Sequence, residues 1–468
     1  MAGKKYNILK AASWYTIGNI LIKGVSFFVL PIFTSLMSTT DYGIYSIYIS
    51  YLSIFEVIIL LGMSSTINIA KYDKEIDFEK YLSTILCVPI LIMIITAFVA
   101  NIYMVSGHGL FSMNQSLWNY LFISATTISI SNIICARLVI EGEYKVYMAY
   151  SMLAVLSNVG ISLLLCYTIF AHDKVYMARV WGNLISNVLS MIFLLYATKV
   201  KFNFDKNYFR KGLSWGLPLL FHTLATVVLT QSDRIVIKYI KGYSVTGIYS
   251  VAVTIIAIPM VLQSSLCSAW TPWFYEKLNQ KDYVSIKKLN DKYIFLFCVI
   301  IAAFILVCPE IIHIFTNRNY WDSVYSLIPL SISVFGEMLY SIPVGIEYYN
   351  KKTNYIMVGT VMTTILNIAL DVLFVLTWGY IGAAYATAIS KLILFAFHWL
   401  FSRKIDRNAI FSSSVVFLCI VGLAIINLFT VLAVNKILYR AAVFMFIGIF
   451  FVLWGFRNRE LLKELLSK

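Results

Sequence analysis

Apolar residues in this chain occur in long runs that are separated by short polar segments. Two examples are the runs at 81–103 and 410–434, which are 23 and 25 residues long. A helix of about 20 apolar residues is long enough to cross the roughly 30 Å hydrocarbon core of a bilayer. Because lipid cannot satisfy free backbone groups, such runs must form helices or closed barrels, and the ten-residue alternation of a barrel is absent. The pattern therefore predicts an all-α integral membrane protein.

We expect about fourteen transmembrane helices. They are predicted at residues 12–36, 41–70, 78–104, 115–138, 146–171, 175–198, 209–239, 244–272, 290–316, 322–349, 354–377, 381–402, 410–435 and 437–457. The connecting segments are short, and the longest, at about 273–289, carries no nucleotide-binding GxxxxGK[ST] motif. An ATP-driven pump would therefore need a separate subunit. A membrane polymerase or acyltransferase usually needs a large outer loop with catalytic groups, and the chain offers none.

The distribution of charged residues predicts the orientation of these helices in the membrane. Only 13% of the residues are charged, 60% are hydrophobic, and the mean hydropathy is +0.82. The net charge of +15 comes from Lys and Arg spread over the short connections, which favours positive-inside topology over nucleic-acid binding. With the N-terminus in the cytoplasm, the inner segments hold 27 of the 37 Lys and Arg residues and the outer loops hold 7. We therefore predict an even number of helices and two cytoplasmic termini. The seven cysteines show no metal-ligand spacing, and we expect no metal site.

A short internal repeat divides the helices. The sequence Gly-Ile-Tyr-Ser occurs at 43–46 and again at 247–250, each time at the start of a predicted helix that follows a short outer loop. Chance is a real alternative in a chain rich in Tyr and Ile, but the equivalent topological position supports a repeat. We predict two six-helix lobes, 1–200 and 201–405, related by a pseudo-two-fold axis along the membrane normal, with two further helices and a cytoplasmic tail in 406–468. Such lobes enclose a substrate cavity and rock about it.

Three motifs resemble those of a known family. A proline at 218 in the seventh helix precedes the run Gln-Ser-Asp-Arg-Ile-Val-Ile at 231–237, which is followed by Val-Thr-Gly-Ile-Tyr-Ser at 245–250. The segment Gly-Tyr-Ile-Gly-Ala-Ala-Tyr-Ala-Thr at 379–387 begins the twelfth helix. Together with the fourteen helices, these motifs resemble the bacterial polysaccharide flippases (Wzx-type, for O-antigen or capsule repeat units). These belong to the multidrug/oligosaccharidyl-lipid/polysaccharide (MOP) exporter superfamily.

The resemblance implies a transporter in the bacterial inner membrane and no enzymatic activity. It implies movement of an undecaprenyl-diphosphate-linked oligosaccharide from the cytoplasmic to the periplasmic leaflet by alternating access. It also implies coupling to a gradient of H⁺ or Na⁺, with no cofactor, and partners that include membrane lipid, a polysaccharide polymerase and a chain-length regulator. The rival functions are a lipid II flippase and a multidrug/cation antiporter of the same superfamily.

Charged residues inside the predicted spans are the candidate site residues, because an ion in hydrocarbon usually faces a cavity or a partner. For the diphosphate and glycan we select five residues: Lys23, Lys391, Arg234, Asn19 and Arg179. Lys23 shares a helix face with Asn19, and Lys391 lies near the middle of the twelfth predicted helix. The alternative is that Lys23 and Lys391 form static ion pairs with Glu56 or Glu337. Intramembrane cations suit an anionic substrate better than the cationic drugs of an antiporter.

Four acidic residues are candidates for ion coupling: Glu56, Glu337, Asp371 and Asp233. Glu56 and Glu337 lie near the middle of their spans, where protonation removes the cost of burying a charge. Asp371 ends a polar stripe with Thr360, Thr364 and Asn367, and Arg179 begins another on the sixth helix. Such stripes either line a cavity or join helices by hydrogen bonds. For His398, inside the twelfth helix, a packed and satisfied ring is the simpler interpretation.

Overall fold

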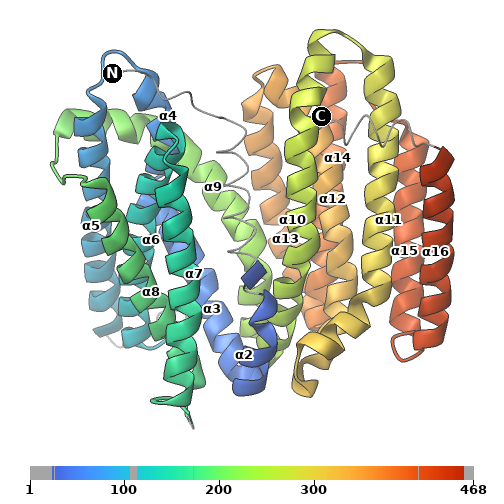
Figure 1. The fold of residues 1–468 in the computed structure, drawn as a ribbon, viewed down its shortest axis with the longest axis horizontal. Coiled ribbons are helices and arrows are strands. Elements are labelled where there is room, and N and C mark those ends of the chain that lie inside the picture. The colour runs from blue at the N-terminus through green and yellow to red at the C-terminus, as the bar shows by residue number, and fades with distance from the viewer. Residues whose placement is uncertain (1–23, 26, 106–112, 172, 409, 458–468) are drawn as a thin grey trace. The chain divides into compact units, whose positions relative to one another are not determined.

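The protein is helical throughout the part of the chain that its computed structural model describes. This part comprises residues 24–25, 27–105, 113–171, 173–408 and 410–457 (Figure 1). Within it, twelve helices are long and apolar enough to cross a membrane, and a shorter apolar helix covers Ile437–Leu453. These, together with the helix expected at 12–36, make up the fourteen predicted spans. The all-α membrane fold is therefore confirmed. Most of the predicted first helix lies outside the described residues, which contain its end as α2 (Leu30–Leu36).

Predicted and observed helices agree to within a few residues at most ends. The observed bounds after α2 are α3 (Thr39–Leu60), α4 (Met63–Tyr72), α5 (Phe78–Val105), α6 (Gln115–Glu141), α7 (Tyr144–Tyr167), α8 (Val175–Thr198), α9 (Lys206–Lys241), α10 (Tyr243–Asn279), α11 (Tyr283–Phe315), the 3₁₀ turn η1 (Arg318–Ser323), α12 (Val324–Tyr349), α13 (Thr353–Trp378), α14 (Tyr380–Ile405), α15 (Ser413–Leu432) and α16 (Ile437–Arg457). Polar side chains begin several of them. Ser38 accepts the backbone N–H of Asp41 at the start of α3, and Asp205 accepts those of Asn207 and Tyr208 at the start of α9.

The chain forms two compact units, residues 1–247 and 248–468. The boundary falls inside α10, so the first turn of this helix belongs to the first unit. The first unit contains α2 to α9, and the second contains the rest of α10 and α11 to α16. The lobes predicted at 1–200 and 201–405, with 406–468 apart, rest on the sequence repeat and stay a prediction.

In the first unit, α6 packs against α3, α5 and α8. An aromatic cluster joins α3 to α6, where Tyr51 and Phe55 contact Trp118. A second apolar cluster gathers α4, α5 and α6 around Met63, Ile67 and Ile134. The hydrophobic effect contributes little to the association of helices in lipid, so van der Waals packing of these large buried side chains holds the helices together.

In the second unit, α14 packs along both α12 and α13, while α11 contacts α12, α15 and α16. The span Arg318–Tyr349, which ends with α12, is the most enclosed of the twelve: 72% of its most apolar 18-residue segment is buried. Polar side chains on α12 are therefore surrounded mainly by protein, which is the environment that intramembrane charges require.

The second predicted helix, 41–70, is broken. Leu61 and Gly62 adopt left-handed backbone conformations, with φ of 49° and 70°, and they divide the span into α3 and α4. A Cβ on Gly216 of α9 would lie 2.6 Å from the carbonyl oxygen of Leu61, so α9 crosses directly against the break. Thr39–Tyr72 is one candidate span, as predicted, but the break inside it was not predicted, because a single glycine in an apolar run does not reveal a left-handed pair.

Candidate functional site

Lys391 and Glu337 form an ion pair between two spans of the second unit. The ammonium of Lys391 lies 2.6 Å from Oε2 of Glu337, and the side chains keep 16% and 33% of their accessible surface. Gly336 makes the pairing feasible, because a Cβ at this position would lie 3.0 Å from the Cβ of Lys391. Helices α12 and α14 therefore approach closely beside the two charges. Of the alternatives open for Lys391, the structure contains the pair with Glu337.

Asp371 lies on a buried face of α13. Its side chain is 0% exposed, as is that of Asn367, and Thr360 and Thr364 of the same stripe are also buried. The amide of Asn367 donates to the hydroxyl of Ser390 on α14 at 3.3 Å. The stripe is therefore part of the α13–α14 contact, as expected when polar residues join membrane helices.

Glu56 pairs with an amide. Its Oε1 accepts a hydrogen bond of 2.7 Å from Asn132 of α6, and the hydroxyl of Ser129 lies 3.3 Å from its backbone oxygen. Lys23 and Asn19 lie outside the described residues, so the candidate pair of Lys23 with Glu56 stays a prediction.

Arg179 of α8 is held by aromatic rings. Its guanidinium carbon lies 3.9 Å from the ring centre of Phe33 and 4.6 Å from that of Tyr45. One guanidinium nitrogen also donates to the hydroxyl of Tyr45 at 3.3 Å. Cation–π contact with two rings keeps the charge in place while it stays half-buried.

Arg234 and Asp233 lie on α9 in the first unit. The guanidinium of Arg234 donates to Oε1 of Gln231 at 2.8 Å, and this oxygen also accepts the hydroxyl of Ser50 on α3 at 2.9 Å. Asp233 is buried and accepts the backbone N–H of Arg234. Nε of Arg234 has no hydrogen-bond partner among the described residues.

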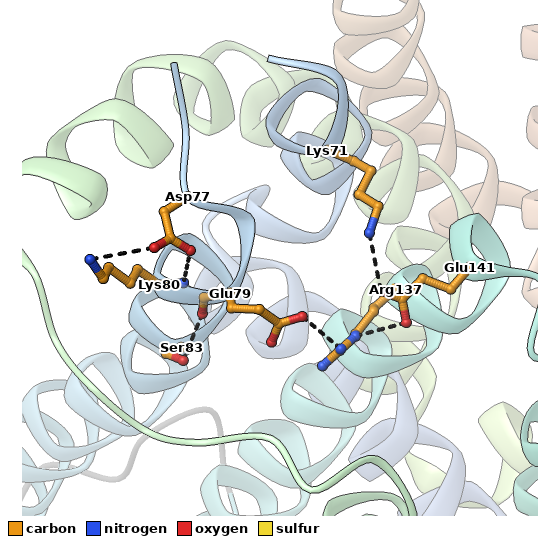
Figure 2. Close-up of polar contacts among 7 residues, drawn as sticks. All are labelled: Lys71, Asp77, Glu79, Lys80, Ser83, Arg137 and Glu141. Atoms are coloured by element: carbon orange, nitrogen blue, oxygen red, sulfur yellow. Dashed lines mark hydrogen bonds and ion pairs between the residues drawn. The ribbon is translucent and has the colours of Figure 1, made fainter. Parts of the chain in front are cut away.

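Three charge clusters were not predicted. The first joins α4, α5 and α6 (Figure 2). Arg137 donates to Glu79 at 2.7 Å and to Glu141 at 2.9 Å, and Lys71 binds Glu141 at 3.2 Å. A spacing of four residues between Arg137 and Glu141 on one helix was the available signal. Beside this cluster, the backbone N–H and ammonium of Lys80 lower the pKa of Asp77, which lies between the spans.

The second cluster is a buried pair between α12 and α14. Nδ1 of His398 lies 2.9 Å from both carboxylate oxygens of Glu347, and both side chains are 0% exposed. His398 is packed as expected, but the ring is not fully satisfied, because Nε2 has no hydrogen-bond partner among the described residues. Its acidic partner was missed. Glu347 lies two residues before the end of α12. A carboxylate at such a position is predicted from the sequence to lie at the membrane surface.

The third cluster ties α16 to α11. Arg440 binds both carboxylate oxygens of Glu310 at 2.6 Å and donates to three backbone carbonyls, those of Leu306, Ala433 and Val434. The positive-inside count treats Arg440 as an outer-loop cation, but its side chain is buried. Among the described residues, no group of three or more His, Cys, Asp or Glu side chains is arranged to hold a metal ion.

The candidates therefore fall in two groups, each described within its own unit. Among the described residues, the first unit holds Glu56, Arg179, Asp233 and Arg234; the second holds Glu337, Asp371 and Lys391. The contacts described above join two pairs of these candidates. One pair is Lys391 with Glu337, and the other is Arg234 with its neighbour Asp233.

Comparison with known proteins places this arrangement in a family. The family model described as "polysaccharide biosynthesis protein" matches residues 8–277, more than half of the chain. An uncharacterised membrane protein of Haemophilus influenzae is 25% identical over 417 residues, which cover 86% of this chain and 98% of the relative. An uncharacterised membrane protein of Methanocaldococcus jannaschii is 22% identical over 463 residues, covering 90% and 88%.

Solved structures share the fold. The lipid II flippase MurJ in an inward closed conformation superposes with a TM-score of 0.73 and 17% identity, covering 96% of this chain and 99% of that one. An inward-facing multidrug resistance transporter of the MATE family, from the MOP superfamily, gives a TM-score of 0.60 and 15% identity over 84% and 98%. At such identities the likeness concerns the fold. The chain thus belongs to the polysaccharide biosynthesis protein family and has the fold of MOP-superfamily transporters.

Proposed function

We propose that this protein is a flippase that moves an undecaprenyl-diphosphate-linked oligosaccharide, an O-antigen or capsular repeat unit, from the cytoplasmic to the periplasmic leaflet. Membership of the polysaccharide biosynthesis family and a transporter fold support this function. The single observation that carries the choice of an anionic substrate is the Lys391–Glu337 pair within two spans. A cation inside hydrocarbon needs a counter-charge, and a diphosphate supplies one.

In this proposal Glu337 holds Lys391 in place until substrate arrives. Lysine carries a compact ammonium on a flexible stem, so it can exchange one anionic partner for another. Glu337 retains a third of its side-chain surface, which leaves it accessible to water when the ammonium moves away. The diphosphate replaces the carboxylate, and the freed carboxylate takes up a proton or a cation. Substrate binding and ion binding are thereby linked at one residue pair.

The other candidates keep the roles assigned to them from the sequence. Arg179, Arg234, Lys23 and Asn19 bind the diphosphate or the glycan, and Glu56, Asp233 and Asp371 contribute to coupling with H⁺ or Na⁺. Arg234 is supported by its Nε, a buried donor that has no hydrogen-bond partner among the described residues. Arg179 is supported by an aromatic cage that holds the guanidinium without a carboxylate partner in that cage. The protein acts in the bacterial inner membrane, with both termini in the cytoplasm, together with a polymerase and a chain-length regulator.

Complementation in two strains tests the substrate. One strain lacks its repeat-unit flippase, and the other is depleted of its lipid II flippase. The proposal predicts that the wild-type chain restores surface polysaccharide in the first strain and does not support growth of the second. The high structural similarity to a lipid II flippase makes this the relevant rival. Growth of the second strain without rescue of the first would replace the proposed substrate with lipid II.

Variants in the first strain test the site. We expect Lys391→Ala to lose most surface polysaccharide and Lys391→Arg to retain part of it. Lys288→Ala, at an exposed position near the start of α11, is the matched control and should complement fully. Full complementation by Lys391→Ala at equal protein level would remove Lys391 from the site.

A further inference from the structure

We propose that Glu347 and His398 form a proton-binding site that drives the conformational change of the carrier. The proposal rests on the proposed function only in one respect: the process to which proton binding is coupled is the movement of the lipid-linked oligosaccharide. It names the proton as a coupling ion and adds this residue pair to the four acidic candidates. The pair joins α12 to α14, and both side chains are fully enclosed within the second unit.

The first argument is the geometry of the pair. Nδ1 of His398 is equidistant from the two carboxylate oxygens of Glu347, at 2.9 Å. One proton on Nδ1 therefore serves both oxygens. Nε2, on the other side of the ring, has no hydrogen-bond partner among the described residues. An imidazole with one nitrogen bound to a carboxylate, and the other able to bind water once it is uncovered, has the arrangement of a proton shuttle.

The second argument is the number of protons that the closed site accepts. With one proton the pair is an imidazolium beside a carboxylate, or a neutral imidazole beside a carboxylic acid. Without this proton, the carboxylate is buried beside a neutral imidazole and has no counter-charge. With two protons, the imidazolium is buried beside a neutral carboxylic acid and has no counter-charge. Unpaired buried charges are strongly unfavourable. The closed packing therefore holds one proton on the pair, and loss of that proton favours opening to water.

The third argument is what covers the ring. A Cβ on Gly359 of α13 would overlap Nε2 of His398, so the glycine lets α13 lie directly on the imidazole. The ring of Tyr340 on α12 packs against another side, with 5.1 Å between ring centres. Tyr340 is the neighbouring titratable group from α12, and it also lies near Glu337 and Tyr348. On α13 the hydroxyl of Thr360 neighbours Tyr340, and on α14 the ring of Phe397 contacts His398.

These contacts define how the proton leaves. Separation of α13 from α14 at Gly359 admits water to Nε2 and then to the carboxylate of Glu347. The proton passes to that water, and imidazole and carboxylate are left hydrated. Glu347 lies two residues before the end of α12 at Tyr349, so the distance to the membrane surface is short. The positive-inside count assigns this end to the cytoplasm. The loaded site is closed, and the empty site is open to that side.

Hydrogen exchange of the purified full-length protein in nanodiscs tests the site without a substrate. The measured quantity is the opening constant of peptides from 353–362, corrected for the intrinsic exchange rate, between pH 6 and pH 9. We expect the wild-type opening constant to rise with pH by up to about tenfold per unit, as loss of one proton requires. Glu347→Gln keeps the shape and needs no proton, so its opening constant should not change with pH. Glu276→Gln, an exposed carboxylate on α10, should behave like the wild type.

A second variant separates proton binding from a simple structural contact. His398→Gln leaves the carboxylate without its imidazole and should exchange faster than Glu347→Gln. The double variant Glu347→Gln/His398→Gln should return to the level of Glu347→Gln. A flat wild-type profile, or the wild-type slope retained in Glu347→Gln, would overturn the proton site.

Proteoliposomes test the coupling, with a fluorescent undecaprenyl-diphosphate-linked oligosaccharide and an imposed pH gradient. The wild type should flip the lipid faster with the gradient than without it, and Glu347→Gln should lose this difference. A difference that persists in Glu347→Gln overturns the coupling role. If the wild type flips no lipid while the exchange slope still depends on Glu347, the proposed function fails and the proton site stands.

Discussion

Gly43 and Gly247 lie against each other. At each glycine, the backbone of the other glycine's segment leaves no room for a side chain. A Cβ on Gly43 would overlap the carbonyl oxygen of Tyr243, and a Cβ on Gly247 would overlap that of Thr39. Thr39 and Tyr243 each precede their glycine by four residues, so the contact is reciprocal. Reciprocal contacts are what a two-fold relation between segments produces. The glycines are the first residues of the two Gly-Ile-Tyr-Ser segments, so the repeat seen in the sequence is also a contact.

Alanine at either glycine should crowd this crossing of α3 and the first turn of α10. We expect Gly43→Ala and Gly247→Ala each to lower the free energy of unfolding by roughly 1–3 kcal/mol, the usual cost of inserting a methyl group where backbone is in the way. Thermal unfolding of the purified protein in detergent measures the change. Gly160→Ala, where a Cβ would meet nothing within 4 Å, is the control and should be neutral or slightly stabilising. Equal behaviour of all three variants would contradict the close contact.

The Lys391–Glu337 pair predicts non-additive effects on stability. Lys391→Ala leaves a carboxylate in a span, and Glu337→Gln leaves an ammonium. Each change should cost roughly 1–3 kcal/mol, below the 3–5 kcal/mol of a fully enclosed pair, because both groups keep some accessible surface. The double variant should cost less than the sum of the two single variants. Simple addition of the two costs, measured by unfolding in detergent, would show that the ion pair is not formed in solution.

Much of the fold follows from the sequence, because length and hydropathy alone determine where a helix must cross lipid. The bounds of α5 and α8 were predicted to within a residue or so of the structure. The break at Leu61 and Gly62 was not predictable in the same way. It depends on a second helix, α9, that reaches the break through Gly216 from 154 residues further along the chain.

The site was predictable to a smaller degree. A charge in the middle of a span, such as Lys391 or Glu337, is conspicuous in the sequence, and these two residues do meet. Charges near the ends of spans are ambiguous, because the same residue can reach water or turn inward. Glu347, His398 and Arg440 turn inward, and only the packing of neighbouring helices decides this.

The cluster around Arg137 predicts a difference between arginine and lysine at one position. Arg137 holds Glu79 and Glu141 through separate nitrogens (Figure 2). A lysine offers a single ammonium and cannot reproduce this fork. We expect Arg137→Lys to cost roughly 1–2 kcal/mol of stability, and less in high salt because Glu79 is exposed. Lys80→Ala, which removes an exposed pair with Asp77, should change the unfolding temperature little. An Arg137→Lys variant as stable as the wild type would show that one carboxylate contact suffices.

Arg440 predicts the largest loss from a conservative change. Its guanidinium binds Glu310 and donates to the carbonyls of Ala433 and Val434, which directly follow the end of α15. Lysine can bind only some of these groups, so Arg440→Lys should cost roughly 2–4 kcal/mol.

Hydrogen exchange should locate this loss at the turn between α15 and α16. Lys436→Met, an exposed cation of the same turn, is the matched control and should leave exchange there unchanged. Removing both charges with Arg440→Met/Glu310→Gln should recover part of the stability lost in Arg440→Met, because no unpaired charge then remains buried. If Arg440→Lys exchanged like the wild type at this turn, the carbonyl contacts would have no role in holding α16 to α11.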